Sequence, residues 1–265
     1  MAKKTSKKTS KKTSNKNNKT VVSAPAILKK QRRVMIATPA YDGRIDAWYN
    51  HSMLLTERAC AQQNILIDPI YVCYDALVEK ARNDLFAYGY ENEYDDIFYI
   101  DSDISWDPQQ FLRILNHPVD FVAGIYPKKS EVEDYPVNLM GEVKTEKGLI
   151  EVASVPTGFL RLSKNAVNIL WKSCPAYTIS QDPKVFKHVF QTGVVGGRYI
   201  SEDILTCLKW RELGHKVWLD PFVTLAHSGH RTWRTNFIDF LKRATVLRQD
   251  GTVVPALSNA DALQS

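Results

Sequence analysis

Short apolar runs alternate with helical patterns through the first half of the chain, and this alternation limits the fold more than any other feature. Runs that suit buried strands occupy residues 33–39, 65–72, 96–100 and 119–125, and helical patterns occupy 46–63, 75–88 and the stretch opened by Asp107-Pro108. Strands that alternate with helices at this spacing form parallel βαβ units. We therefore predict an α/β fold with a mostly parallel central sheet flanked by helices.

The second half of the chain is less regular, but it contains no linker rich in Gly, Ser or Pro. Its pattern predicts one or two antiparallel strands within 137–155, helices over 165–172 and 202–213, and short strands at 217–219 and 223–226. We expect one domain over residues 33–246, followed by a weakly ordered segment over 247–265.

The net charge of +6 is unevenly distributed along the chain. Residues 1–33 hold ten Lys, two Arg and no acid, whereas the remainder holds 23 basic and 29 acidic side chains. The motif Lys-Lys-Thr-Ser occurs three times between Lys3 and Ser14. Because such a segment cannot bury enough apolar surface to offset its ordering entropy, we predict a disordered tail over residues 1–32. The tail suits contact with a polyanion such as DNA, or a solubilising or membrane-surface role.

The remaining composition is that of a globular protein, with 44% hydrophobic residues. No apolar run approaches the roughly 20 residues of a transmembrane helix, and no signal peptide is evident, so we expect a cytoplasmic protein. No Cys-x-x-Cys pair occurs, which argues against structural zinc and a disulfide framework. We expect buried free thiols at Cys60, Cys73, Cys174 and Cys207.

Asp101 and Asp103 directly follow the apolar run 96–100. Two aspartates at this spacing are expected about once by chance at this composition, so their position carries the significance. Ligands of open parallel sheets bind beyond the carboxyl ends of strands, and paired carboxylates there suit Mg²⁺ or Mn²⁺. Such an ion neutralises the charge on a leaving diphosphate. The alternative is that Ser102 or Asp103 begins the turn into the helix at Pro108.

Several segments resemble glycosyltransferases with the GT-A fold, above all the small enzymes encoded by bacteriophages and large DNA viruses. Residues 96–108, which include Asp101-Ser102-Asp103, resemble the DxD segment of that family. Further similar segments, in the family's order between residues 33 and 235, are Ile36-Ala37-Thr38-Pro39-Ala40-Tyr41, Ala81-Arg82-Asn83, Ser201-Glu202-Asp203 and 213–221.

The resemblance implies a single GT-A-like, Rossmann-like domain that binds a nucleotide-sugar donor with Mn²⁺ or Mg²⁺. The donor-binding residues that it implies are Thr38, Pro39, Tyr41, Arg82, Asn83 and Asp101. The guanidinium of Arg82 suits phosphate, but an ion pair with Asp84, Glu79 or Asp101 is an equal alternative. Tyr41 either stacks on a base or packs against the protein.

The resemblance also implies roles for residues later in the chain. In inverting members of the family the Asp of the Glu-Asp pair is the general base, which here is Asp203; in a retaining enzyme it would instead contact acceptor or sugar. An acid that complements the helix N-terminus is the alternative. A late histidine completes the metal shell in several members, and we prefer His227 to His230 for this role beside Asp101 and Asp103. The residues implied on the acceptor side are Thr157, Gly158 and Glu202, and Lys128 and Lys129 either line the site or are solvated.

The predicted function is therefore metal-dependent transfer of a sugar from a nucleotide-sugar to an acceptor hydroxyl. The acceptor is either a glycan or a hydroxymethylated base in phage DNA. Nucleotidyl transfer ranks lower, because the loop after the first strand, Pro39-Ala40-Tyr41-Asp42-Gly43-Arg44, holds one glycine. A non-catalytic nucleic-acid-binding protein would use the basic tail, but the acidic remainder argues against that role alone.

Overall fold

A nine-stranded central sheet organises the described part of the chain. In this computed structural model the described residues are 30–141, 143, 145–180, 182–247 and 253–256. The predicted basic tail lies outside them as far as residue 29, and so do residues 248–252 and 257–265 of the predicted C-terminal segment. From Gln31 onward, the described residues form one compact unit.

The strands of this sheet lie in the order β2-β1-β3-β9-β5-β14-β8-β6, with β7 paired to β8. Their bounds are β1 Arg32–Ala40, β2 Ile65–Cys73, β3 Asp96–Ile100, β5 Phe121–Gly124, β6 Asn138–Leu139, β7 Thr145–Glu146, β8 Leu149–Ser154, β9 Phe159–Ser163 and β14 Val217–Asp220. β1 is parallel to β2 and β3, and β14 is parallel to β5, whereas β8 and β9 are antiparallel to their neighbours. The fold is α/β with a mostly parallel central sheet, as the alternation predicted.

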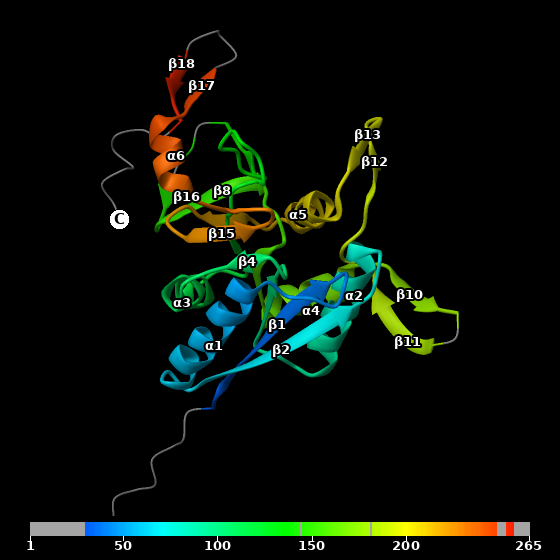
Figure 1. Cartoon of the computed structure of the whole chain (residues 1–265). Coiled ribbons are helices and arrows are strands. Elements are labelled where there is room, and N and C mark those ends of the chain that lie inside the picture. The colour runs from blue at the N-terminus through cyan, green and yellow to red at the C-terminus, as the bar shows by residue number, and fades with distance from the viewer. Residues whose placement is uncertain (1–29, 142, 144, 181, 248–252, 257–265) are drawn as a thin grey trace, which may run out of the picture. The chain divides into compact units, whose positions relative to one another are not determined.

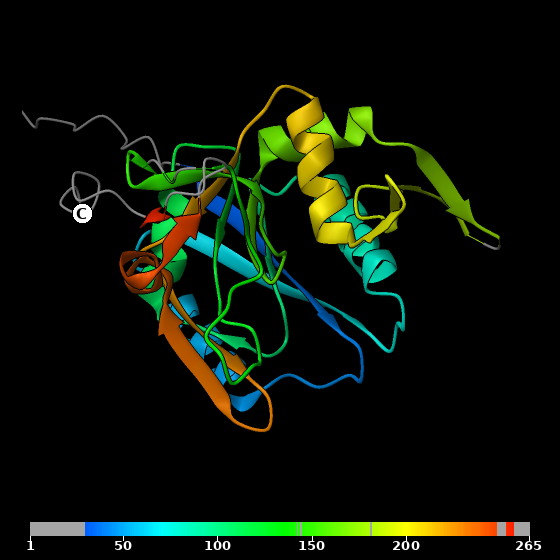
Figure 2. The same ribbon diagram turned by 90° about the horizontal axis from the view of Figure 1, so that it is seen from above.

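Helices cover both faces of the sheet (Figures 1 and 2). On one face pack α1 (Ala47–Ala61) and α3 (Pro108–Asn116), and on the other α2 (Val78–Glu91), α4 (Lys164–Ser173) and α5 (Glu202–Glu212). Successive residues of β1 alternate between the two cores, with Val34 and Ile36 in one and Met35 and Ala37 in the other. A strand buried on both faces is a continuous apolar run, which is why the sequence predicted β1 well.

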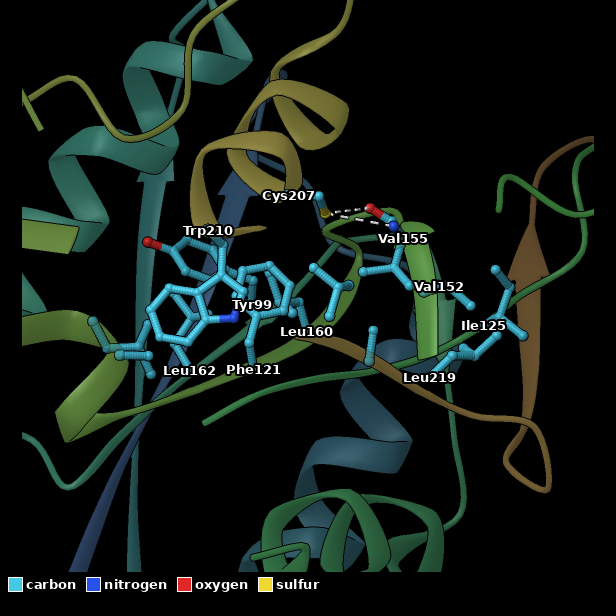
Figure 3. Close-up of a cluster of buried hydrophobic side chains, with 14 of the residues drawn as sticks. Tyr99, Phe121, Ile125, Val152, Val155, Leu160, Leu162, Cys207, Trp210 and Leu219 are labelled. Atoms are coloured by element: carbon cyan, nitrogen blue, oxygen red, sulfur yellow. Dashed lines mark hydrogen bonds between the residues drawn. The ribbon is translucent and has the colours of Figure 1, made fainter. Parts of the chain in front are cut away.

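The core under α5 fixes that helix on the sheet (Figure 3). Trp210 is 1% exposed and stacks on Phe121 of β5 with ring centroids 5.8 Å apart. The thiol of Cys207 accepts a hydrogen bond from the backbone N–H of Val155 at 3.5 Å and donates to its carbonyl oxygen at 3.7 Å. Burial of one large apolar side chain stabilises a fold by about 1.5–3 kcal/mol, so these contacts hold the middle and the end of α5 on the sheet.

A second, three-stranded sheet lies beside the central one, in the order β16-β15-β4. It consists of β4 (Ile104–Ser105), β15 (Thr224–Ser228) and β16 (Thr232–Asn236). Helix α6 (Phe237–Arg243) follows it, and three hairpins complete the structure: β10 (Ala176–Ile179) with β11 (Asp182–Lys187), β12 (Gly193–Val195) with β13 (Arg198–Ile200), and β17 (Thr245–Leu247) with β18 (Val253–Pro255). The sequence patterns did not predict β9, β16, α6 or the hairpins.

Two local expectations differ from the structure. The helix expected over 75–88 begins at Val78, because the carboxylate of Asp75 accepts the N–H of Leu77 at 3.1 Å and holds the preceding residues in a turn. The four cysteines are free, but Cys73 at the end of β2 is exposed while the other three are buried. None of the helices in the described part of the chain has the length and apolar run needed to span a bilayer.

Candidate functional site

The aspartate pair occupies a tight turn at the carboxyl end of β3. The backbone N–H of Asp101 donates to the carbonyl oxygen of Gly158 at 3.1 Å, and the N–H of Ile104 donates back to the carbonyl oxygen of Asp101 at 3.0 Å. The neighbours of β3 in the sheet are β1 and β9. The two carboxylates therefore lie at the strand-end position where open α/β sheets bind ligands. The alternative was that Ser102 or Asp103 begins the turn into this helix. The residue that caps α3 is Asp107, whose side chain accepts the N–H of Gln109 at 3.0 Å.

Strand β15 brings His227 to Asp103. His227 pairs with Ile104 across the β15–β4 ladder, and the N–H of Ser228 donates to the carbonyl oxygen of Asp103 at 2.8 Å. The Nε2 atom of His227 consequently lies 3.5 Å from Oδ2 of Asp103. The Nδ1 atom lies 2.9 Å from the carbonyl oxygen of Pro127, which can only accept, so the N–H at Nδ1 donates to it. The Nε2 atom of His227 therefore faces the carboxylate of Asp103.

This orientation is the one that metal-binding histidines adopt, with the second ring nitrogen held by a backbone carbonyl. The ammonium of Lys129 supplies positive charge at this place, since Nζ lies 2.5 Å from Oδ2 of Asp103. Burial by itself raises the pKa of Asp103, but the bonds from His227 and Lys129 outweigh it, so the pKa lies below its usual value.

Two side chains, rather than the expected three, are candidate ligands for a cation here. Among the described residues, no group of three or more His, Cys, Asp or Glu side chains converges on one point. Asp103 and His227 fit an ion that completes its shell with water and substrate phosphate, as Mg²⁺ does where it is bound through one or two carboxylates. Asp101 differs from the expected third ligand because its carboxylate is turned towards Arg82.

Asp101 is fixed by close packing as well as by charge. A Cβ at position 158 would overlap Oδ2 of Asp101 and the hydroxyl of Tyr126, so only glycine leaves room for this carboxylate. Burial raises the pKa of Tyr126, and the negative charge of Asp101 adds to this, so the phenol remains protonated. Tyr126 was not singled out from the sequence, since an isolated Tyr after an apolar run carries no signal of its own.

Arg82 joins the aspartate turn to the start of α5. Its side chain is 7% exposed; Nη2 donates to Oδ1 of Asp101 at 2.9 Å, and Nη1 donates to Oε1 of Glu202. Burial opposes the charge of Arg82, but these two carboxylates raise its pKa, so it is always charged. The structure therefore shows Arg82 in the ion pair with Asp101 that was the alternative to phosphate binding, and a second ion pair with Glu202.

The other expected donor-binding residues differ in exposure. Asn83 is 1% exposed and is bound through both ends of its amide to the backbone of residues 189–190. Thr38 is fully buried and shares a hydrogen bond of 2.6 Å with the hydroxyl of Tyr49, and Pro39 is partly buried. Of the expected set, Tyr41 is the one that is widely exposed, at 72%.

A second tyrosine lies close to that loop. The ring of Tyr74 fills the space that a Cβ of Gly43 would need, and the N–H of Tyr74 donates to the carbonyl oxygen of Ala40 at 3.3 Å. Tyr74 is 80% exposed and has a positive φ of 62°. No sequence pattern singled it out, because its proximity to Gly43 depends on the pairing of β1 with β2.

Asp203 shares a pocket with His227. The pocket has a volume of about 440 Å³, and its lining residues are Tyr126, Lys128, Lys129, Pro136, Pro156, Asp203 and His227. Oδ1 of Asp203 accepts hydrogen bonds from the Ser201 hydroxyl and from the N–H of Ile204, the latter at 2.8 Å. Within the described residues Oδ2 has no partner, which leaves it available to a ligand. The expected acceptor-side residue Thr157 is 2% exposed, and Glu202 is 9% exposed and bound to Arg82.

Comparison with known proteins gives no match to a family model and none to a curated protein. Among solved structures, protein A197 from STIV is similar with a TM-score of 0.47 and 13% identity, over 86% of this chain and 95% of that chain. A glycosyltransferase involved in the glycosylation of the major capsid of PBCV-1 is similar with a TM-score of 0.31 and 14% identity, over 53% of this chain and 66% of that chain. Likeness at this level assigns no function, so the function is inferred from the site itself.

Proposed function

We propose that this chain is a metal-dependent glycosyltransferase that moves a sugar from a nucleotide-diphosphate-sugar to an acceptor hydroxyl. The observation that carries the proposal is the pocket that Asp203 and His227 both line, with Asp103 lying 3.5 Å from His227. Sugar transfer needs these two functions together: a site for a cation at the leaving diphosphate and a carboxylate at the attacking hydroxyl.

The cation site consists of Asp103 and His227. A bound Mn²⁺ or Mg²⁺ supplies charge neutralisation on the leaving diphosphate. Lys128 and Lys129 add positive charge to the same pocket and favour an anionic donor. Arg82 holds Asp101 in place beside this site and keeps the turn from moving when the donor binds.

Asp203 is the proposed general base. Its Oδ1 is held by Ser201 and the N–H of Ile204, so Oδ2 is the atom that accepts the proton of the acceptor hydroxyl. The acceptor oxygen forms a bond to the anomeric carbon as the bond from that carbon to the phosphate oxygen breaks. The electron pair leaves with the nucleoside diphosphate, the proton stays on Asp203, and the sugar inverts its configuration. Asp203 lies in the first turn of α5, which fixes the position of its carboxylate.

The acceptor is a saccharide in the main form of the proposal, and a hydroxymethylated base in DNA in the second form. The second form is supported by the basic residues of the tail, which would attract duplex DNA through its phosphates. Phosphate contacts carry no sequence information, so the tail would raise only the local concentration of acceptor.

The test is hydrolysis and transfer with a panel of nucleotide-sugars, each assayed with Mn²⁺, with Mg²⁺ and with excess chelator. We expect release of nucleoside diphosphate from one donor, dependent on the cation and accelerated by an acceptor. Parallel assays offer oligosaccharides and hydroxymethylated duplex DNA as acceptors, at low and moderate salt, with the full chain and with residues 1–20 deleted. Full activity in chelator would contradict metal dependence, and release of inorganic diphosphate would indicate nucleotidyl transfer.

A further inference from the structure

A second pocket lies on the side of the small sheet away from His227. Cross-strand partners point to one face of a sheet, so Arg234, Ala226 and Ser105 form one row across β16, β15 and β4. Trp233, His227 and Ile104 form the adjacent row and point to the opposite face. The first row lines a pocket of about 220 Å³, to which residues of α1 also contribute.

The floor of this pocket is rigid. Trp106 is 6% exposed, and its backbone N–H donates to the hydroxyl of Ser52 at 3.0 Å while its indole N–H donates to the hydroxyl of Thr56 at 2.8 Å. Its ring meets Tyr49 edge-on at 5.3 Å. A floor whose polar atoms are all bonded to α1 does not rearrange when a ligand binds, which lowers the entropic cost of binding.

One wall is an exposed tryptophan. Trp48 lies in the first turn of α1 and is 60% exposed, with its ring in edge contact with His51 at 6.2 Å. A solvent-facing indole offers a flat apolar face that a ligand can cover. The apolar C–H face of a sugar ring matches such an indole face, while the sugar hydroxyls remain free for polar partners.

The opposite wall supplies polar groups. Arg234 is exposed, and within the described residues it makes no ion pair or hydrogen bond through its side chain. Its guanidinium is a planar fork that matches two adjacent oxygens, either vicinal hydroxyls or a carboxylate. Ser105 and Thr224 add hydroxyl groups to the same lining. An indole and a guanidinium that line the same pocket suit a saccharide, which has apolar C–H faces and hydroxyl groups.

The pocket is linked to the catalytic turn. The N–H of Asp46, which caps α1, donates to the carbonyl oxygen of Ser102 at 2.8 Å, so the start of α1 is joined to the aspartate turn. Strand β4, which lines the pocket through Ser105, directly follows Asp103. A chain of sugars that occupies this pocket therefore lies next to the metal loop without occupying the pocket of Asp203.

We propose that the pocket between α1 and the small sheet binds a sugar unit of an oligosaccharide acceptor, at a distance from the reacting hydroxyl. This deepens the proposed glycosyl transfer, on which it rests, by assigning an acceptor-anchoring site to Trp48 and Arg234. The site binds without catalysing, so its occupancy is measurable in the absence of donor and of turnover.

The test is calorimetric and NMR titration of the full chain with two probes, neutral maltohexaose and acidic hexagalacturonate. We expect at least one probe to bind, and Trp48→Ala and Arg234→Ala each to weaken that binding by about tenfold or more, a loss of about 1.4 kcal/mol. Leu54→Ala is the matched control, because Leu54 is 48% exposed on the same helix but does not line the pocket. If Trp48→Ala does not fold, Trp48→Phe and Arg234→Ala serve in its place.

Binding of neither probe at millimolar concentration would overturn the inference, as would binding that is unchanged in both pocket variants. Because Asp203→Asn is expected to lower turnover strongly and leave this binding intact, failure of the anchoring site is distinguishable from failure of the proposed transferase activity.

Discussion

Oδ2 of Asp103 and Nε2 of His227 lie 3.5 Å apart, although the two residues are distant in the sequence. The pairing of β15 with β4 sets this distance, and the carbonyl of Pro127 orients the ring. If the pair binds a cation, Asp103→Ala and His227→Ala should each lose transfer activity and require more Mn²⁺ for what remains. The fold should survive, because Asp103 is 36% exposed.

Mn²⁺ titrations of transfer activity, with circular dichroism of each variant, measure this. Asp239→Ala is the control, since it removes an exposed carboxylate of α6. Wild-type activity and wild-type Mn²⁺ dependence in both site variants would disprove the metal assignment.

Asp203→Asn keeps the shape of the side chain and removes its ability to accept a proton. Turnover should fall by about two to four powers of ten, the usual contribution of general-base catalysis, while donor affinity changes little. Single-turnover kinetics and donor titration separate the two effects. Glu212→Gln, at the other end of α5, is the matched control. Near-normal turnover in Asp203→Asn would leave Asp203 as an acid that only complements the helix dipole.

Arg82→Met leaves the carboxylates of Asp101 and Glu202 partly buried without their shared cation. Removing one partner from a buried ion pair costs about 3–5 kcal/mol, so urea denaturation should show a loss of that order. Arg231→Met removes a cation from an exposed pair with Glu131 and should cost less than about 1 kcal/mol. Equal losses in the two variants would show that the buried bridge does not stabilise the fold.

The ion pair of Lys129 with Asp103 should give the stability a measurable pH dependence in metal-free protein. Asp103 has a lower pKa in the folded chain than its usual value of 3.8, because the bonds from His227 and Lys129 outweigh the effect of burial. A group of this kind stabilises the fold above its unfolded pKa, and the contribution is lost as pH falls through the folded pKa.

Lys129→Met should therefore cost up to about 1 kcal/mol at neutral pH, since both side chains are partly exposed. The difference from wild type should vanish in acid, once Asp103 is protonated. Urea unfolding at a series of pH values measures it, with Lys172→Met as an exposed control. A difference that persists below the pKa of Asp103 would contradict this interpretation.

The sequence by itself determined the elements whose signals are local. The run Asp96–Ile100 is a strand because an apolar segment buried on both faces can be little else, and Asp101 and Asp103 follow it directly. Asp107-Pro108 begins α3 because a capping carboxylate and an N-terminal proline act within one turn. The acids that open α5 were likewise visible as a local pattern.

The tertiary structure alone decided which groups meet. Nothing in the five-residue sequence of β9 indicates its direction, and the strand lies antiparallel between β3 and β5. Arg82 has the same local sequence whether it binds phosphate or carboxylate, and the position of α5 determines that it binds Glu202. Packing between distant segments brings Lys129 to Asp103, and it places Trp48 and Arg234 in the lining of one pocket. Side-chain partners across such distances depend on the whole arrangement of the chain, which no short segment encodes.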